Sequence, residues 1–508
     1  STIDIIGGRY VDARAALNAS SAWSGLGLIA VVALYIRQRK ANKTESAWRS
    51  AKIGIGLLAV SGLDALPVAV IMVVIRNIVS LIEQWNTLIG AWIGSNLWAP
   101  HHIAALIAGV SAMMLAQFAR GKSNSRQFTI MIIAGLGFAS AFGLSIWVTL
   151  VFAIFWSIWL VVLFLQKTEK RSIAPMVFAG IMALFFAAPF LLGLFQDTSG
   201  GTGQFPIVFE IRTLMLLESF VREWSPMARS LIMLAILPAN YLFELGFFFI
   251  IGIYWFKIKS KETIRSNPFY QAEILLLAVV LLIGSCLRST VITSNDLGWR
   301  SWLPGQFVLL IWGVDVIEVL LFNKNDAMVA FIKPGEIAKT RTFLRVLIAI
   351  GILTSTLDIL SIRLAWPVQA GQTIGQRSYS ARLTYDYLRD HIPANVITQN
   401  NPTDILERPS GLYGTHQMVI SDRTAYGVPA DVFQKVVNEI KVLFINRNVT
   451  NWQLIDKLCQ QYSIDVLIIK DTDPIWSSLA TLKKQRPALY ENVHYDLFAC
   501  GNYTRFQK

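Results

Sequence analysis

Long apolar runs separated by short, strongly basic loops set the tightest limit on how this chain can fold. Runs long enough to cross a bilayer recur from about residue 15 to residue 366 of the 508 residues. Their length suits helices, which satisfy their own backbone hydrogen bonds in hydrocarbon. The pattern therefore predicts an α-helical polytopic membrane protein with about ten transmembrane helices. We place them near residues 15–36, 53–75, 102–118, 128–144, 147–166, 173–195, 231–256, 270–287, 302–321 and 343–364.

Composition and charge agree with this class. Hydrophobic residues make up 54% of the chain and charged residues 15%, and the mean hydropathy is +0.51, well outside the soluble average. The net charge of +13 does not indicate nucleic-acid binding, because most of the excess Lys and Arg lies in short loops between apolar runs. Such loops mark the cytoplasmic side. We expect a multi-pass protein of the cytoplasmic (inner) membrane, in contact with membrane lipid and with no nucleic-acid partner.

The basic loops also predict which segments face outward. They follow the first, third, fifth, seventh and ninth runs, so all five fall on one side if every run crosses. Segments 76–101, 196–230 and 288–301 then face outward, together with everything after residue 366. The N-terminus would also lie outside, and we therefore expect a further span upstream of Ser1.

One apolar stretch, 128–166, has no polar turn. Charge alternation favours two helices with a tight outer turn near Gly143 and Ser145, because an even number of crossings is needed there. Helices that stop short inside the membrane would satisfy the same count.

The composition changes after Trp366, where helical and strand patterns alternate. Ser463–Lys470 is apolar and β-branched, which is typical of a central strand, and Val493–Cys500 predicts an edge strand. We expect a transmembrane domain, 1–366, and a small extracytoplasmic α/β domain, 367–508. Cys459 and Cys500 could form one disulfide in that compartment, although the sequence does not show that they are close.

The densest polar group in the outward loops is TSNDLGWRSWLPGQ, residues 293–306. Arg288 and Arg300 flank Asn295 and Asp296, and charges at the mouth of a membrane-buried segment are expensive. Two guanidiniums at an outer membrane surface can hold a phosphate or pyrophosphate bidentately. Asp296 would orient one of them or act as a base. The alternative is an Arg–Asp pair that only stabilises the loop, with two nearby tryptophans, Trp299 and Trp302, in the interfacial belt.

The outward segment 76–101 predicts a helix that lies in the membrane interface. Three tryptophans recur about two helical turns apart, at Trp85, Trp92 and Trp98, as in a helix with its aromatic face in lipid. Glu83 lies within it, and His101 and His102 stand where the next run begins. Either the helix is only an anchor with solvated histidines, or it is a wall of a lipid-facing site in which Glu83 or a histidine contacts substrate.

Two other places carry charge. Segment 196–230 mixes acids with bases that include Arg212, which predicts a solvated amphipathic helix or, alternatively, a lid over a cavity with an arginine on a phosphate. Asp64 lies inside the second run, beside Pro67, where an acid is a functional candidate or is paired with another helix. The sequence has no metal-ligand spacing, nucleotide loop or nucleophile elbow. A divalent cation is the one cofactor that stays open.

This layout resembles the GT-C superfamily of membrane glycosyltransferases, whose bacterial members take sugars from polyprenyl-phosphate donors. The resemblance covers most of the chain and rests on pattern rather than on one decisive motif. The stretches that carry it are SGLDALP at 61–67, IEQWN at 82–86 with WAPHH at 98–102, NDLGWR at 295–300 and YSIDVLIIKDTD at 462–473.

The resemblance implies a function at the outer face of the membrane. A hexosyl or pentosyl group would pass from a polyprenyl-phosphate-linked sugar to an acceptor whose hydroxyl a carboxylate deprotonates, while arginines hold the leaving phosphate. GT-C enzymes carry their key acid in the first outward loop, so Asp4 and Asp12 join Asp296 as candidate catalytic acids, and sequence upstream of Ser1 would complete that loop. The candidate substrate-binding residues are Arg300, Arg288, Asn295, Glu83, His101, His102 and Arg212.

A non-enzymatic membrane protein is the alternative. It would be a flippase or transporter of lipid-linked sugar, or an assembly subunit with partners in a membrane complex. A transporter should show paired broken helices near the midplane. The sequence offers the Asp64–Pro67 stretch but no matching partner in the other half.

Overall fold

The computed structural model describes residues 13–40, 44–75, 86, 89–119, 122–166, 170–199, 207–289, 295–322, 336–360, 371–403, 413–420 and 430–501. The chain divides into two compact units. The membrane unit comprises Ser20–Phe190 and Phe205–Trp366, and the C-terminal unit comprises Pro367–Lys508 together with Ser1–Ala19 and Leu191–Gln204.

Within these ranges, nine helical segments are long and apolar enough to cross a membrane. The polytopic helical fold predicted from the sequence is confirmed, with nine such segments in place of about ten. Eight are, or lie within, the helices α2 (Ala13–Arg39), α6 (Pro100–Ala119), α7 (Asn124–Leu144), α8 (Ile146–Leu165), α9 (Lys170–Ser199), α11 (Pro226–Leu245), α14 (Pro268–Cys286) and α17 (Ile337–Leu360). The ninth, Asp296–Phe322, joins α15 (Asp296–Arg300), α16 (Trp302–Ile317) and the π-helical η4 (Glu318–Phe322).

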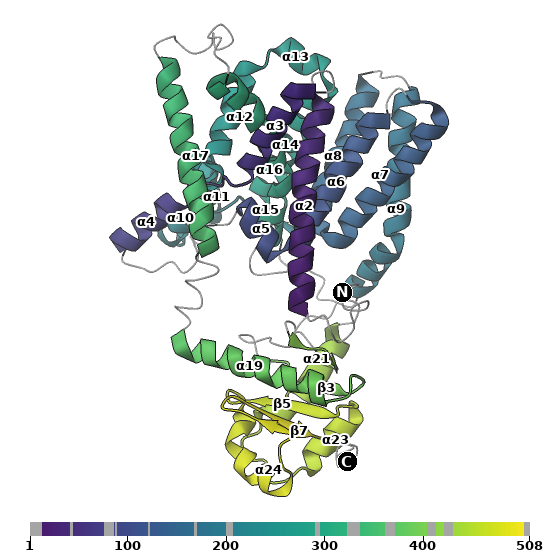
Figure 1. Ribbon diagram of the computed structural model, residues 1–508, viewed down its shortest axis with the longest axis vertical. Helices are drawn as coiled ribbons and strands as arrows, with labels where there is room; N and C mark the ends of the chain where they lie inside the picture. The colour runs from purple at the N-terminus through teal and green to yellow at the C-terminus, as the bar shows by residue number, and fades with distance from the viewer. Residues whose placement is uncertain are drawn as a thin grey trace. The chain divides into compact units, whose positions relative to one another are not determined.

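Helix α16 forms the centre of the membrane unit, and each of its residues is buried. It packs on α14, on α3 (Thr44–Leu57) and on α12 (Phe247–Ile258). Figure 1 shows α6 to α9 side by side on one flank of this unit and α17 on the other. The basic ends of α2 and α12, the basic starts of α7 and α17 and the short α13 (Lys261–Ser266) lie at one end, here called the basic end (Figure 1).

Two runs that we predicted as single spans are each broken. In the run 53–75, α3 ends at Leu57, and α4 (Ala65–Val70) begins only after Asp64 and continues into the π-helical η2 (Ile71–Ile75). In the run 231–256, α11 ends and α12 begins around Gly246, whose φ is +52°. Hydropathy did not reveal either break, because both keep an apolar composition.

The two breaks pack against each other inside the protein. Leu63 donates its backbone N–H to the carbonyl of Phe243 at 2.6 Å, and Ser61 donates to the carbonyl of Gly351 in α17 at 3.2 Å. Non-helical backbone is tolerated at membrane depth only where protein or water satisfies it. The break between α11 and α12 is therefore a second broken helix that matches the break before Asp64, and the sequence did not reveal it. Asp64 itself is only 3% exposed.

The 128–166 stretch forms two helices, as charge alternation predicts. Helices α7 and α8 meet at Ser145, which has extended backbone angles of φ −158° and ψ 109°. Its hydroxyl accepts a hydrogen bond from the N–H of Val148 at 3.3 Å and so caps α8.

The predicted interfacial helix in 76–101 is described only at residue 86 and from residue 89 onward. There it is the short helix α5 (Trp92–Trp98). Trp98 is 65% exposed, but Trp92 is 2% exposed and belongs to the core, so the expected lipid-facing position of Trp92 is wrong. Glu83 and Trp85 lie outside the described residues.

A buried group of charges joins four helices at the basic end. The guanidinium of Arg39 forms two bonds of 3.0 Å to Asp315 and lies 2.9 Å from Glu273. Lys259 lies 3.2 Å from Asp315. Two cations thus balance two carboxylates, which offsets the large desolvation cost of burying each charge alone.

The C-terminal unit contains a five-stranded mixed sheet in the order β4-β3-β5-β7-β6. Its strands are β3 (Ile397–Gln399), β4 (Gln417–Met418), β5 (Val466–Lys470), β6 (Tyr490–Glu491) and β7 (Tyr495–Ala499). Strand β3 runs parallel to β4 and β5, whereas β7 is antiparallel to β5 and β6. The helices are α19 (Gly371–His391), α21 (Ala430–Ile440), α22 (Val442–Ile445), α23 (Gln453–Gln461), the 3₁₀ turn η8 (Pro474–Ser478) and α24 (Leu479–Gln485).

The predicted α/β fold of this unit and its central strand are confirmed, since every residue of β5 is buried. The expected edge position of Val493–Cys500 is wrong, because β6 pairs with the far side of β7. Two residues of strand are too short to give a periodic signal in the sequence.

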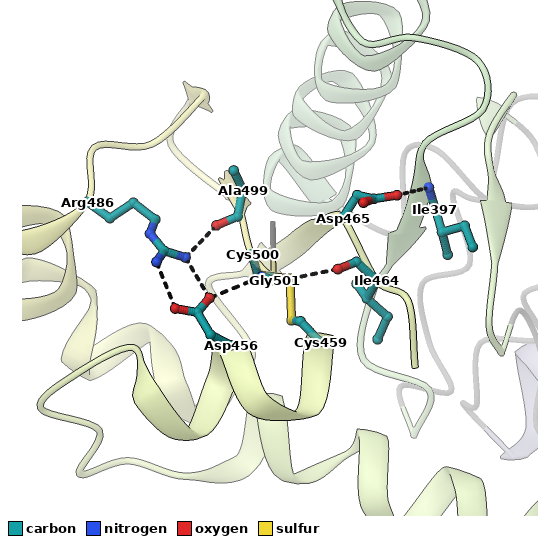
Figure 2. The surroundings of a disulfide bond; sticks show 9 residues. All are labelled: Ile397, Asp456, Cys459, Ile464, Asp465, Arg486, Ala499, Cys500 and Gly501. Atoms are coloured by element: carbon teal, nitrogen blue, oxygen red, sulfur yellow. Dashed lines mark hydrogen bonds and ion pairs between the residues drawn. A yellow bond between two sulfur atoms is a disulfide. The ribbon is translucent and has the colours of Figure 1, made fainter. Parts of the chain in front are cut away.

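One disulfide closes the C-terminal unit. It joins Cys459 on α23 to Cys500 after β7, with the two Cα atoms 6.0 Å apart and a sequence separation of 41. Figure 2 shows an ion pair beside it, in which Arg486 forms two bonds of 2.8 Å to Asp456. The same carboxylate accepts the N–H of Gly501 at 3.1 Å. The bridge that the sequence left open is formed.

Candidate functional site

The described residues of the loops that we predicted to face outward lie at the end of the membrane unit away from the basic end (Figure 1). Strand β2 (Leu287–Ser289) follows α14 directly and pairs antiparallel with β1 (Ile207–Phe209). The chain after β1 continues along the end of α14, because Glu210 donates its N–H to Cys286 at 3.0 Å and Arg212 donates to Ser285 at 2.8 Å. The charged 196–230 segment is therefore not one solvated helix: after β1 it forms α10 (Met215–Val221) and the first turn of α11.

The NDLGWR stretch is mostly helical rather than a loop. It forms the short helix α15, and Asn295 precedes it as the N-cap. The side-chain oxygen of Asn295 accepts the N–H of Gly298 and the N–H of Ser289, each at 3.1 Å. This predicted ligand thus ties α15 to β2. Trp302, which we considered for the lipid belt, is fully buried.

Two arginines that the sequence singled out meet at α15. Arg212 is 4% exposed and donates from Nη1 to the carbonyl oxygen of Gly298 at 2.9 Å. Arg300 is 3% exposed, and its Cζ lies 3.2 Å from the centroid of the Trp299 ring. Two buried guanidiniums need negative charge close by, which an anionic ligand or protein carboxylates can supply.

A carboxylate and two histidines face the same arginine. Asp296, on the first turn of α15, interacts electrostatically with Arg300 and with His101. His101 and His102 open α6 with their ring centroids 4.0 Å apart, and both feel the charge of Arg300. His102 is held by Ser145, whose Oγ lies 2.7 Å from Nδ1. We call Arg212, Arg300, Asp296, His101 and His102 the arginine cluster.

Glu244 is a member of this neighbourhood that the sequence reading missed. It is 2% exposed in the last turn of α11 and interacts electrostatically with Arg212. Its carboxylate accepts the side-chain amide of Asn86 and the N–H of Ile89, each at 2.7 Å. An acid inside an apolar run is a recognisable signal, and the run 231–256 contained it.

Arg288, predicted beside Arg300 on one phosphate, has a different partner. It donates from Nη1 to Glu210 at 2.9 Å, and the two side chains are 41% and 40% exposed. Glu210 and Arg288 both line a cavity. Arg212, and not Arg288, therefore bonds to α15, the helix that carries Arg300.

The remaining candidates cannot be placed, because Asp4, Asp12 and Glu83 lie outside the described residues. In the part of the chain that is described, no three His, Cys, Asp or Glu side chains gather closely enough to hold a metal ion. The carboxylate and imidazoles of the arginine cluster also face the positive charge of Arg300, which would repel a cation. These residues do not suit the divalent cation that the sequence left open.

Comparison with solved structures finds chains of similar fold. A crystal structure of ArnT from Cupriavidus metallidurans bound to undecaprenyl phosphate aligns with a TM-score of 0.44 and 13% identity, covering 95% of this chain and 83% of that one. Archaeal AglB from Archaeoglobus fulgidus, in complex with an inhibitory peptide and a dolichol-phosphate, aligns with a TM-score of 0.42 and 13% identity. An apo oligosaccharyltransferase from the same organism gives 0.43 and 11%.

The chain spans 58% and 59% of the length of the two archaeal chains and aligns over 90% of its own. No protein-family model matches the sequence, and a search of curated proteins gives no match. The described residues have the long apolar helices of a polytopic membrane protein.

Proposed function

We propose that the chain is a glycosyltransferase of GT-C type, which moves a sugar from a polyprenyl-phosphate donor to an acceptor at the outer face of the cytoplasmic membrane. The observation that carries this proposal is the burial of Arg212 and Arg300 around α15, at an end of the membrane unit. Arginine forks match phosphate oxygens in geometry and charge. A lipid phosphate at the bilayer surface would lie at this end of the membrane unit.

In the proposed reaction the acceptor oxygen attacks the anomeric carbon, and the bond from that carbon to the phosphate oxygen breaks. The electron pair leaves with the phosphate, and Arg300 and Arg212 stabilise its developing negative charge. The acceptor proton passes to a carboxylate. Asp296 is a described candidate for this acid, because it interacts electrostatically with Arg300, and Asp4 and Asp12 remain candidates for the same role.

We also propose that the arginine cluster and the C-terminal unit lie on the outer side of the inner membrane. The basic loops support this orientation, because Lys and Arg accumulate in cytoplasmic loops. The disulfide between Cys459 and Cys500 supports it as well, because stable disulfides form in extracytoplasmic compartments.

The test is binding of undecaprenyl phosphate to the full chain in lipid nanodiscs, followed by native mass spectrometry. A charge-assisted hydrogen bond contributes about 1.5–3 kcal/mol, so Arg300→Gln should weaken binding roughly 10- to 100-fold and lower transfer from a polyprenyl-phosphate sugar. Arg222→Gln is the control, because Arg222 is an exposed arginine of the segment 196–230, which also contains Arg212. Unchanged affinity in a folded Arg300→Gln variant would remove Arg300 from the donor site.

A lipid-linked sugar flippase is the second candidate, since the paired breaks before Asp64 and at Gly246 resemble the discontinuous helices of transporters. Liposomes that carry the protein and a fluorescent polyprenyl-phosphate sugar separate the two functions. A flippase moves the labelled lipid between leaflets without any acceptor. A transferase releases polyprenyl phosphate, and it does so only when an acceptor is present.

A further inference from the structure

The membrane unit holds a polar cavity that the proposed donor site does not use. Its volume is about 350 Å³. Two carboxylates and two guanidiniums line it, from Glu210, Glu218, Arg229 and Arg288. The other lining residues are Phe209, Ile211, Thr213, Pro226, Ser230 and Met233.

A single segment of chain separates this cavity from the arginine cluster. Ile211 and Thr213 line the cavity, whereas Arg212 between them reaches the carbonyl of Gly298 on α15. Side chains of extended backbone alternate between two faces, so this segment presents one face to each site. Asn240 holds it in place by donating to the carbonyl of Thr213 at 3.1 Å. The cavity and the donor site are therefore neighbours that share a wall.

The charges of the cavity suit a neutral ligand rich in hydroxyl groups. Glu210 and Arg288 neutralise each other as an ion pair. Glu218 and Arg229 add one more charge of each sign, and neither forms an ion pair with another described side chain. Carboxylates accept hydrogen bonds from hydroxyls and guanidiniums donate to them, so together they can bind the vicinal hydroxyls of a sugar.

Size and shape agree with the same ligand. A volume of about 350 Å³ is at the lower end of the range for small-molecule sites. Phe209 lines the cavity and is 75% exposed, which offers an aromatic face for a pyranose ring to pack against. We propose that this cavity is the acceptor site and that it binds a neutral, hexose-sized sugar group. This inference rests on the proposed function, because the acceptor must lie next to the donor.

Binding of simple glycosides to the full chain tests the inference. Saturation-transfer NMR would use methyl α-glucopyranoside, methyl α-galactopyranoside and methyl α-mannopyranoside as probes. We expect at least one of them to bind the wild type, and Glu218→Gln and Arg229→Gln each to weaken that binding at least about tenfold, the effect of losing roughly one charged hydrogen bond. Glu223→Gln and Arg222→Gln are matched controls, because both residues are exposed in the same segment and do not line the cavity.

Three results would overturn the inference. The first is no glycoside binding to the wild type, and the second is equal binding by the cavity variants and their controls. The third is inorganic phosphate that binds competitively with the glycosides and is lost in Arg229→Gln, which would make the cavity an anion site.

The donor and acceptor proposals can fail separately. Undecaprenyl phosphate binding should be unchanged in Glu218→Gln and weakened in Arg300→Gln, whereas glycoside binding should be weakened in Glu218→Gln and unchanged in Arg300→Gln. If only the Arg300-dependent binding is found, the acceptor inference falls and the donor site stands. If only the Glu218-dependent binding is found, the donor site falls.

Discussion

Gly62 shows how little space separates the two broken helices. A Cβ atom at this position would lie 2.6 Å from the carbonyl oxygen of Phe243, closer than real Cβ atoms approach backbone. The neighbouring Leu63 donates its N–H to the same oxygen, so the backbone cannot retreat without losing that bond. Only glycine fits here.

Gly62→Ala should therefore destabilise the membrane unit by about 1–3 kcal/mol, the usual cost of overpacking a tight site. Gly56→Ala is the control, because a Cβ at Gly56 in α3 meets nothing within 4 Å and alanine favours helix. Thermal unfolding in detergent checks both variants. Equal unfolding temperatures for the two would show that the contact between the breaks is loose.

Single residues of the candidate site were partly predictable. Arg300, Asp296 and His101 stood out because charge is rare beside apolar runs, and the structure brings them together. What the sequence could not show is which of the other predicted arginines bonds to α15, the helix that carries Arg300. Arg288 is nearer to Arg300 along the chain than Arg212 is, yet Arg212 is the one bonded to α15, because β1 and β2 pair.

At the scale of elements, α15 depends on its cap. Asn295→Ala removes an oxygen that accepts two backbone N–H groups, and loss of an N-cap costs about 1 kcal/mol. We expect lower stability and weaker undecaprenyl phosphate binding, because α15 carries Arg300. Asn295→Asp should restore both, since aspartate caps equally well. A failure of Asn295→Asp to restore binding would indicate that the amide itself contacts the ligand.

The elements that sequence could and could not predict differ in physical character. The turn at Ser145 was predictable from charge alternation, because the basic loops on either side of 128–166 require an even number of membrane crossings between them. The breaks at Gly246 and before Asp64 did not, because hydropathy measures composition and both breaks are satisfied by distant partners such as Phe243 and Gly351. Helix–strand alternation likewise predicted the C-terminal α/β fold but not the two-residue strand β6.

For the whole molecule, we propose a transmembrane domain, 1–366, and an extracytoplasmic domain, 367–508. Cysteine reactivity tests this orientation, because the chain has three cysteines of which only Cys286 is free. Protein denatured directly from cells without reductant should take up one polyethylene glycol maleimide. Reduced protein should take up three. Three additions without reductant would mean that Cys459 and Cys500 remain thiols in the cell, as expected for a cytoplasmic domain.

The charges at the basic end also restrict how a long lipid could enter. Sliding α16 by one turn would move Asp315 away from Arg39 and Lys259 and leave carboxylates stranded in hydrocarbon, at several kcal/mol each. At the other end of this helix, Gln306 is tied to the carbonyl of Gly90 at 3.0 Å. Polar contacts thus hold α16 in place at both of its ends. The segment of α11 is the least buried of the described spans, and we expect a polyprenyl chain to enter beside α11 and not beside α16.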